Sequence, residues 1–236
     1  MFGLPGSVSG IVISMNPNDK AGRKPKLTPV PDGPFAYENG LHPEGGGIFN
    51  SRGEDLPCGS EARLCRCGNS SNKPFCDGTH AKVGFDSKNV SDRRLDSRHS
   101  YVGKGITIHW NPIICSHAGF CWQELPDVFR LDRRPWIDPD AAEPAEIMKV
   151  IDKCPSGALS YSVDGVEKED PDREPRITVT RNGPYCLTGG IEVVSKVPRG
   201  EGVTHEHCSC CRCGASRNKP YCDGAHILIG FEDDKN

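Results

Sequence analysis

Alternating apolar and polar positions predict short strands over most of this chain. Residues 33–41 and 183–191 share one pattern, in which a Gly-Pro turn precedes a short strand, a second turn and a second strand. Residues 106–110, Ile-Thr-Ile-His-Trp, also alternate as a half-buried strand does. Residues 1–24 show little periodicity, and we expect a weakly structured segment there, with an edge strand at 11–14.

A helical pattern occurs at residues 143–152. Pro144 suits the first turn of a helix, because its missing N–H is not needed there. Three apolar residues then fall on one face, and they are Ile147, Val150 and Ile151. The sequence therefore predicts an amphipathic helix at this position.

Composition indicates a loop-rich protein with small cores. Of the 236 residues, 35% are hydrophobic and 7% aromatic, and there are 27 glycines and 20 prolines. This length suits two or three small domains rather than one large one. Domains with small cores commonly need an additional stabilising cross-link, and a metal centre can provide it. The net charge of −3 argues against a non-specific nucleic-acid binder.

The thirteen cysteines cannot all form internal disulfides, because their number is odd. The simplest compartment for them is a reducing cytoplasm, where thiols stay available to metals. The N-terminus has neither a basic leader nor a long apolar run, so we expect no signal peptide and no membrane anchor.

One cysteine-rich stretch occurs twice. Residues 65–80 read CRCGNSSNKPFCDGTH, and residues 211–226 read CRCGASRNKPYCDGAH. Each copy offers three thiols and one imidazole at the same spacing. The candidate metal ligands are Cys65, Cys67, Cys76 and His80 in the first copy, and Cys211, Cys213, Cys222 and His226 in the second.

The spacing predicts how each copy closes a metal site. One residue separates Cys65 from Cys67, so their sulfurs can converge from a tight loop. Pro74 suits a helix start, and a helix from there would place Cys76 and His80 on one face. Thiolates with an imidazole suit either zinc or an iron–sulfur cluster, and the spacing alone leaves both open.

The wording of the stretch, Cys-x-Cys-x2-Ser-x3-Pro-x-Cys-Asp-Gly-(Thr/Ala)-His, resembles the CDGSH (mitoNEET-like) iron–sulfur family. Thr79 and Ala225 stand where the family has serine. The resemblance implies one [2Fe–2S] cluster in each copy, held by its three cysteines and its histidine. The membrane anchor of mitoNEET-like relatives does not carry over to this sequence.

The strand-rich segment before each stretch extends the repeat to a small domain, at about 25–90 and 174–236. In the family two chains pair into one β-rich body, so the resemblance implies that the tandem copies form an intramolecular pseudo-dimer. The residues expected near its shared core are Tyr37, Phe85, Tyr185 and Phe231. The alternative is two independent domains on a linker.

The segment between the copies, about 100–168, carries another cysteine set. Cys115 and Cys121 lie six residues apart, and Cys154 follows the predicted helix in the run Cys-Pro-Ser-Gly-Ala-Leu. This set resembles the divergent single-cluster ferredoxin family. The resemblance implies that the three cysteines hold a [3Fe–4S] cluster, or a [4Fe–4S] cluster whose fourth iron takes His117, water or another ligand. The alternative is an empty packing module, and His117 is expected at the surface or beside the ligands rather than on the metal.

The cysteines outside these sets are Cys58, Cys186, Cys208 and Cys210. The sequence identifies no partner for the first. The second lies in a predicted strand and is expected to be a buried thiol. The last two adjoin Cys211 and are alternative ligands during cluster loading. We expect His205 and His207 to be exposed loop residues.

The predicted fold class is α+β, with two small β-rich CDGSH domains and a ferredoxin-like α+β insert between them. No nucleophile triad, phosphate-binding glycine loop or carboxylate pair is evident in the sequence, so we expect no enzyme. The favoured function is a one-electron carrier that acts with redox partner proteins, as a monomer with an internal pseudo-two-fold axis. The alternatives are a cluster donor to apo iron–sulfur proteins, a redox or pH sensor, and a structural zinc module.

Overall fold

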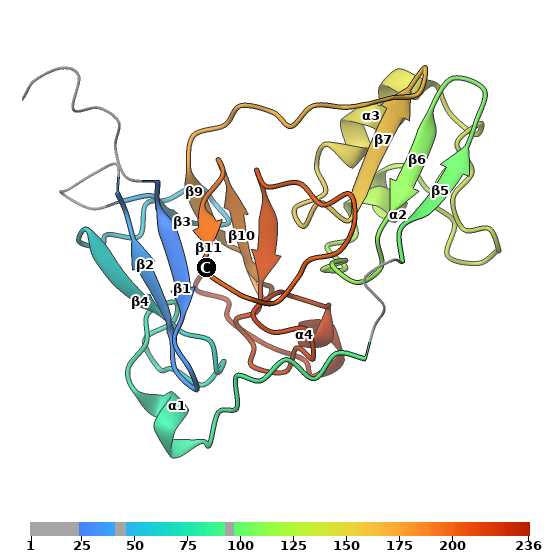
Figure 1. The fold of residues 1–236 in the computed structure, drawn as a ribbon. Helices are drawn as coiled ribbons and strands as arrows, with labels where there is room; N and C mark the ends of the chain where they lie inside the picture. Colours follow the sequence, from blue (N-terminus) through green and yellow to red (C-terminus); the bar gives the residue numbers. More distant parts are fainter. Residues whose placement is uncertain (1–23, 41–45, 93–96) are drawn as a thin grey trace, which may run out of the picture.

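The computed structural model describes residues 24–40, 46–92 and 97–236. Within these ranges the chain forms three four-stranded sheets and four short helices, shown in Figure 1. The edge strand expected at 11–14 lies outside the described residues. The helices are α1 (Thr79–Lys82), α2 (Phe120–Glu124), α3 (Pro144–Ile151) and α4 (Ala225–Leu228). No helix in the described ranges has both the length and the apolar content needed to cross a membrane.

Two of the sheets are built by the repeated segments. The first sheet has the order β11 (Glu192–Val193), β1 (Lys26–Pro29), β2 (Phe35–Glu38), β4 (Glu61–Leu64). The second has the order β12 (Cys208–Cys210), β10 (Tyr185–Thr188), β9 (Arg176–Val179), β3 (Ile48–Asn50). Each sheet is therefore a three-stranded antiparallel unit from one repeat, extended by one strand of the other repeat.

The exchanged strands pair in parallel with their host sheets. β1 pairs with β11, and Leu27 lies opposite Val193. β3 pairs with β9, and Ile48 lies opposite Ile177. Because each exchanged strand hydrogen-bonds to the other repeat, neither repeat completes its sheet alone.

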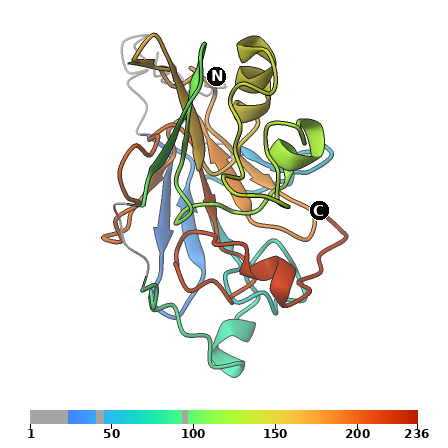
Figure 2. The ribbon, with the colours of Figure 1, turned by 90° about the vertical axis from the view of Figure 1, so that its right-hand side faces the viewer.

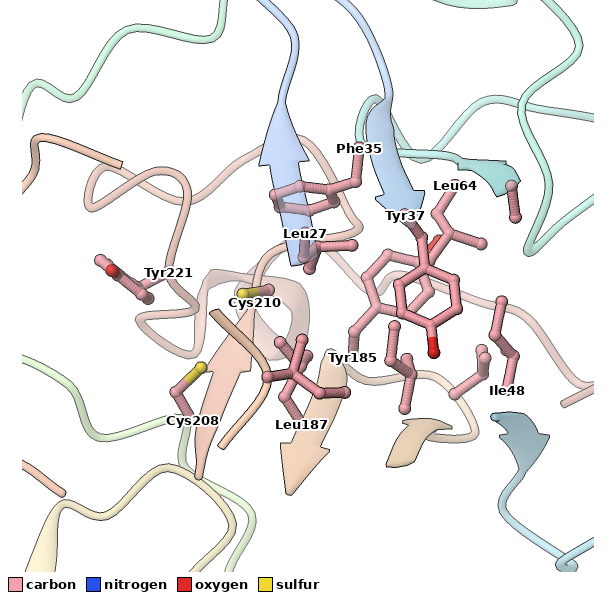
Figure 3. Close-up of a cluster of buried hydrophobic side chains, with 14 residues drawn as sticks. Leu27, Phe35, Tyr37, Ile48, Leu64, Tyr185, Leu187, Cys208, Cys210 and Tyr221 are labelled. Carbon is pink, nitrogen blue, oxygen red and sulfur yellow. The ribbon is translucent and has the colours of Figure 1, made fainter. Parts of the chain in front are cut away.

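The two sheets enclose one hydrophobic core, drawn in Figure 3. Its buried side chains come from both repeats, and the largest include Phe35, Tyr37 and Leu64 from the first and Tyr185 and Leu187 from the second. Phe35 and Tyr185 meet edge to face, with ring centroids 6.1 Å apart.

Tyr37 and Tyr185 lie in this core as expected, but the expectation for two phenylalanines is wrong. Phe85 is half-buried beside the Arg66 guanidinium, and Phe231 packs on cysteines of the second metal stretch. Both phenylalanines follow a metal stretch in the sequence and lie outside the strands that enclose the shared core.

The segment between the repeats forms the third sheet and its own core. The antiparallel sheet has the order β5 (His99–Val102), β6 (Thr107–Trp110), β7 (Leu159–Val163), β8 (Val166–Glu167). Helix α3 packs on β7 and begins with Pro144, as the sequence predicts. Its buried residues are the three expected ones, Ile147, Val150 and Ile151. They pack against Ile108 and Tyr161 of the sheet.

This central domain lies beside the second repeat rather than the first. In Figures 1 and 2, α4 lies between α1 and the central domain, and α1 stands at the far end of the molecule. Asn218 Nδ2 donates to the carbonyl oxygen of Ile113 (3.2 Å), and Ser209 Oγ donates to that of Pro155 (3.2 Å). These bonds tie the central domain to the second repeat.

Ile147→Ala should destabilise the central domain by about 3 kcal/mol, because it leaves a cavity at a position with no exposed surface. Urea unfolding followed by tryptophan fluorescence reports this domain, since Trp110 and Trp136 pack on its core. Leu131→Ala, at a position that is 60% exposed, is the matched control and should change little. Equal destabilisation by both variants would contradict this description of the core.

Candidate metal centres

In the first copy, the four candidate donors lie as two pairs. Cys65 and Cys67 follow β4, and their Sγ atoms are 3.7 Å apart. Cys76 and His80 form the second pair, with 3.3 Å between Cys76 Sγ and His80 Nδ1. The nitrogen that faces the sulfurs is therefore Nδ1.

The prediction of a helix starting at Pro74 is wrong. α1 begins only after Cys76, so of the second pair only His80 lies within it. The intervening chain is extended, because the N–H of Cys65 bonds to the carbonyl oxygen of Pro74 (2.8 Å) and that of Cys76 to the carbonyl oxygen of Arg63 (2.8 Å). Pairing with the end of β4 thus brings the second donor pair beside the first.

The second copy repeats this arrangement. The Sγ atoms of Cys211 and Cys213 are 3.8 Å apart, and Cys222 Sγ lies 3.5 Å from His226 Nδ1. The N–H of Cys211 bonds to the carbonyl oxygen of Pro220 (2.9 Å), so the chain is extended here too, and α4 begins only after Cys222.

Each pair has the spacing of two ligands on one tetrahedral metal. Bonds of about 2.3 Å to sulfur and about 2.0 Å to nitrogen separate two sulfurs by roughly 3.8 Å, and a sulfur from a nitrogen by roughly 3.5 Å. The distances in both copies agree with these values. In addition, the N–H groups of Gly78 and Gly224 lie 3.4 Å from Cys76 Sγ and Cys222 Sγ.

The serine and the aspartate of the stretch shape the loop between the pairs. Ser70 Oγ donates to the carbonyl oxygen of Phe75 (2.6 Å). The Asp77 carboxylate accepts the N–H groups of Thr79 (3.0 Å) and Ser71 (2.8 Å). Hydrogen bonds from Thr79 and Ser71 hold the pKa of Asp77 well below its usual range. The second copy repeats both arrangements, so these residues fix the loop rather than the metal.

The two copies touch where their first donor pairs end. Cys67 and Cys213 form an antiparallel backbone bridge. A Cβ atom on Gly68 would lie 2.6 Å from the carbonyl oxygen of Cys213, and one on Gly214 would lie 2.7 Å from that of Cys67. Both glycines also have positive φ, 79° and 83°. This contact therefore requires glycine on both sides.

A buried arginine lies in each copy, which the sequence analysis missed. Arg66 is 4% exposed and Arg212 is 2% exposed. Arg212 forms a buried ion pair with Asp233, whereas Arg66 donates to the carbonyl oxygen of Val30 (2.9 Å). Burial lowers the pKa of Arg66, and the thiolate of Cys211 opposes that shift. The signal that could have found both is the arginine between the first two cysteines of each copy.

Tyr185 of the second repeat braces the first site. Its buried hydroxyl lies 2.9 Å from the carbonyl oxygen of Cys65 and 3.0 Å from that of Pro74. It therefore contacts both residues of the backbone pairing that brings the donor pairs together. No sequence signal marks this contact, because the matching residue of the first repeat is Phe35.

The central candidates Cys115, Cys121 and Cys154 line one cavity of about 460 Å³. Burial raises the pKa of Cys115 to about 12 and that of Cys121 to about 11, and the charge of Cys154 adds to both shifts. Thiolates gathered in such a cavity need a cation to offset their charge, so the donor set fits a metal cluster. His117 lines the same cavity and is exposed, as expected.

All thirteen cysteines lie in the described part of the chain, and none of them forms a disulfide. Cys208 and Cys210 are buried in the shared core. Two smaller expectations are wrong. Cys186 is only half-buried, because it lies at the surface that faces the central domain. His207 is half-buried rather than exposed, because its Nδ1 pairs with Glu206 Oε2 (2.8 Å).

Gly68→Ala should reduce the iron content of both CDGSH sites, because its methyl group would collide with the backbone of Cys213. Gly78→Ala is the matched control, since Gly78 has a similar positive φ but open space around its Cβ position. That control should cost only about 1–2 kcal/mol of backbone strain. Iron per chain and melting temperature, measured for both variants, separate the collision from the strain. Equal losses in the two variants would contradict the close contact.

Comparisons with known proteins agree with these sites. The family model described as iron-binding zinc finger, CDGSH type, matches residues 32–81 and 182–227. The model described as divergent 4Fe-4S mono-cluster matches residues 101–164. Two relatives, each named uncharacterized protein YjdI, come from Escherichia coli strain K12 and Escherichia coli O157:H7. Each is 48% identical over 61 residues, which cover 26% of this chain and 80% of the relative. This chain therefore belongs to the CDGSH iron-binding family, with two CDGSH regions flanking a divergent single-cluster 4Fe–4S domain.

Proposed function

We propose that this protein is a one-electron carrier that binds two [2Fe–2S] clusters and a third cluster in its central domain. The observation that carries the proposal is the division of each CDGSH donor set into two pairs. Each pair has the spacing of two ligands on one tetrahedral metal. Two such pairs match the two irons of a [2Fe–2S] centre.

The paired arrangement favours a cluster over a single zinc ion. A zinc ion would draw all four donors of a copy around one point. The donors of each copy instead lie as two pairs, which makes a structural zinc module the weaker reading.

Three thiolates and one neutral imidazole determine how charge is distributed in each site. Bound there, a [2Fe–2S] cluster supplies a one-electron couple. Cys65 and Cys67 place two negative charges at one end, and Cys76 and His80 place one at the other. Less negative charge would oppose an added electron at the end that Cys76 and His80 would hold, so this end would favour it. The positive charge of buried Arg66 acts on Cys211 of the second copy, where it would favour an added electron.

The central domain supplies the third site in this proposal. Cys115, Cys121 and Cys154 would hold the cluster, and the match to a 4Fe–4S family supports a [4Fe–4S] over a [3Fe–4S] centre. A fourth ligand other than cysteine, such as water, would complete it. No catalytic role is proposed for any of these residues.

The strand exchange supports the pseudo-dimer within one chain. Strand β3 of the first repeat joins the sheet of the second, and β11 of the second joins the sheet of the first. The two repeats also share one core and form a backbone bridge between Cys67 and Cys213. One chain would thus supply both halves of a body that the family builds from two. We therefore propose a monomer that works with separate redox proteins in a reducing compartment such as the cytoplasm.

A second candidate function is donation of a cluster to apo iron–sulfur proteins. The observation that favours it is the partial exposure of Cys76 and His80 in the first copy. A loosened histidine bond there would leave the cluster open to transfer. Reduction by a ferredoxin reductase without loss of iron supports the carrier, and transfer to an apo-ferredoxin supports the donor.

Protein purified without oxygen tests the proposal. We expect a coloured sample with about four irons and as many acid-labile sulfides from the two CDGSH copies, plus those of the central site. Electron paramagnetic resonance of the reduced protein should show [2Fe–2S] signals. A colourless protein that contains zinc and no sulfide would overturn the proposal.

His80→Cys should lower the reduction potential of the first cluster, because a thiolate replaces a neutral imidazole and adds negative charge. The first cluster of the variant should also resist acid better, because the imidazole nitrogen at which protons compete with iron is gone. Redox titration and the rate of bleaching at pH 5 measure the two effects. A raised potential with unchanged acid lability would contradict the assignment of His80 as a ligand.

A further inference from the structure

The two CDGSH copies have the same donors but different surroundings. In the first copy Cys76 and His80 are half-buried, and α1 has no buried residue. In the second copy Cys222 is 3% exposed and His226 is 8% exposed. The difference is confined to the second donor pair, because the first pairs are buried in both copies.

The central domain causes this difference. The ring of His117 occupies the space beside Gly224, where a Cβ atom would lie 2.3 Å from His117 Cδ2. The matching Gly78 of the first copy has open space at its Cβ position. His117 is itself exposed, so it lies between the solvent and the loop that carries Cys222.

His117 of the central domain also shares a groove with His226. This groove has a volume of about 810 Å³ and is also lined by Phe120 of α2. The groove thus brings a side chain of the central domain next to a donor of the second site.

The linker after the first copy covers a further part of the second. The N–H of Val90 donates to the carbonyl oxygen of Arg217 (2.9 Å), and Asn89 Nδ2 donates to that of Lys219 (3.0 Å). These contacts hold the linker along the loop between the two donor pairs of the second copy. This linker begins where the first copy ends.

We infer that the two CDGSH sites have different roles: the first is the exchange site that meets external reactants, and the second is a shielded site held against the central domain. This inference rests on the proposed iron–sulfur function. It adds that a partner protein reaches the first site directly, through Cys76 and His80. It also makes His117 a positioning residue that covers the second site.

Chelation kinetics of the complete, cluster-loaded protein test the inference. Dithionite-reduced protein is mixed with bathophenanthroline disulfonate, and [2Fe–2S] signals are followed by electron paramagnetic resonance in frozen aliquots. We expect two phases, with the second site losing iron about tenfold more slowly, because access to it requires local opening. Cys65→Ala should abolish the fast phase, and Cys211→Ala should abolish the slow one. A single phase, or the opposite assignment, would overturn the inference.

His117→Ala tests the cause of the shielding. It should speed the slow phase several-fold and leave the fast phase unchanged, because His117 lies against Gly224 of the second copy, whereas nothing lies within 4 Å of the matching Cβ position at Gly78. His99→Ala is the matched control, since His99 lines the central cavity on β5 but does not line the groove with His226. An unchanged slow phase in His117→Ala would show that this residue does not shield the site.

Iron and sulfide analysis of the same samples tests the proposed iron–sulfur function separately from the unequal roles of the two sites. Protein that carries [2Fe–2S] clusters but loses them at one rate would leave the proposed function intact and contradict the unequal roles. Protein that holds no cluster would contradict both.

Discussion

The structure depends on one piece of backbone pairing within each metal stretch. Each stretch has a turn with a cis peptide bond, before Pro74 in the first copy and before Pro220 in the second. After this turn the chain runs back along the end of β4 in the first copy and of β12 in the second. The bonds from Cys65 to Pro74 and from Cys76 to Arg63 place the third cysteine beside the first two. The metal loop is thus an extension of the sheet.

That sheet is complete only when both repeats are present. β11 borders the first sheet and β3 borders the second, and the buried side chains of both sheets form one core. The first metal site depends on the second repeat in a further way, because the Tyr185 hydroxyl bonds to the backbone of Cys65 and Pro74. A substitution that destabilises either repeat should therefore affect both metal sites.

What could be predicted from the sequence was local. The helix α3 follows from Pro144 and three apolar residues at helical spacing, because its own residues decide it. The candidate donors of the two CDGSH copies could be proposed because each set lies in one short stretch that occurs twice. The helix expected at Pro74 failed because pairing with β4 outweighed the local preference of proline for a first turn.

The unequal surroundings of the two copies could not be predicted. Gly78 and Gly224 have the same sequence context, yet only the second lies under His117. That contact joins residues far apart in the chain, and it depends on how the central domain packs against the second repeat. The buried arginines are an intermediate case, because their repeated position hints at a role but not at their burial.

The central claim is that each copy holds a two-iron core through three sulfurs and the Nδ1 atom of one histidine. Pulsed electron paramagnetic resonance on reduced protein labelled with ¹⁵N-histidine measures that bond directly. The account predicts a nitrogen coupling that changes with the label and that disappears only when both His80 and His226 are replaced. A reduced cluster signal with no coupling to histidine nitrogen would contradict it.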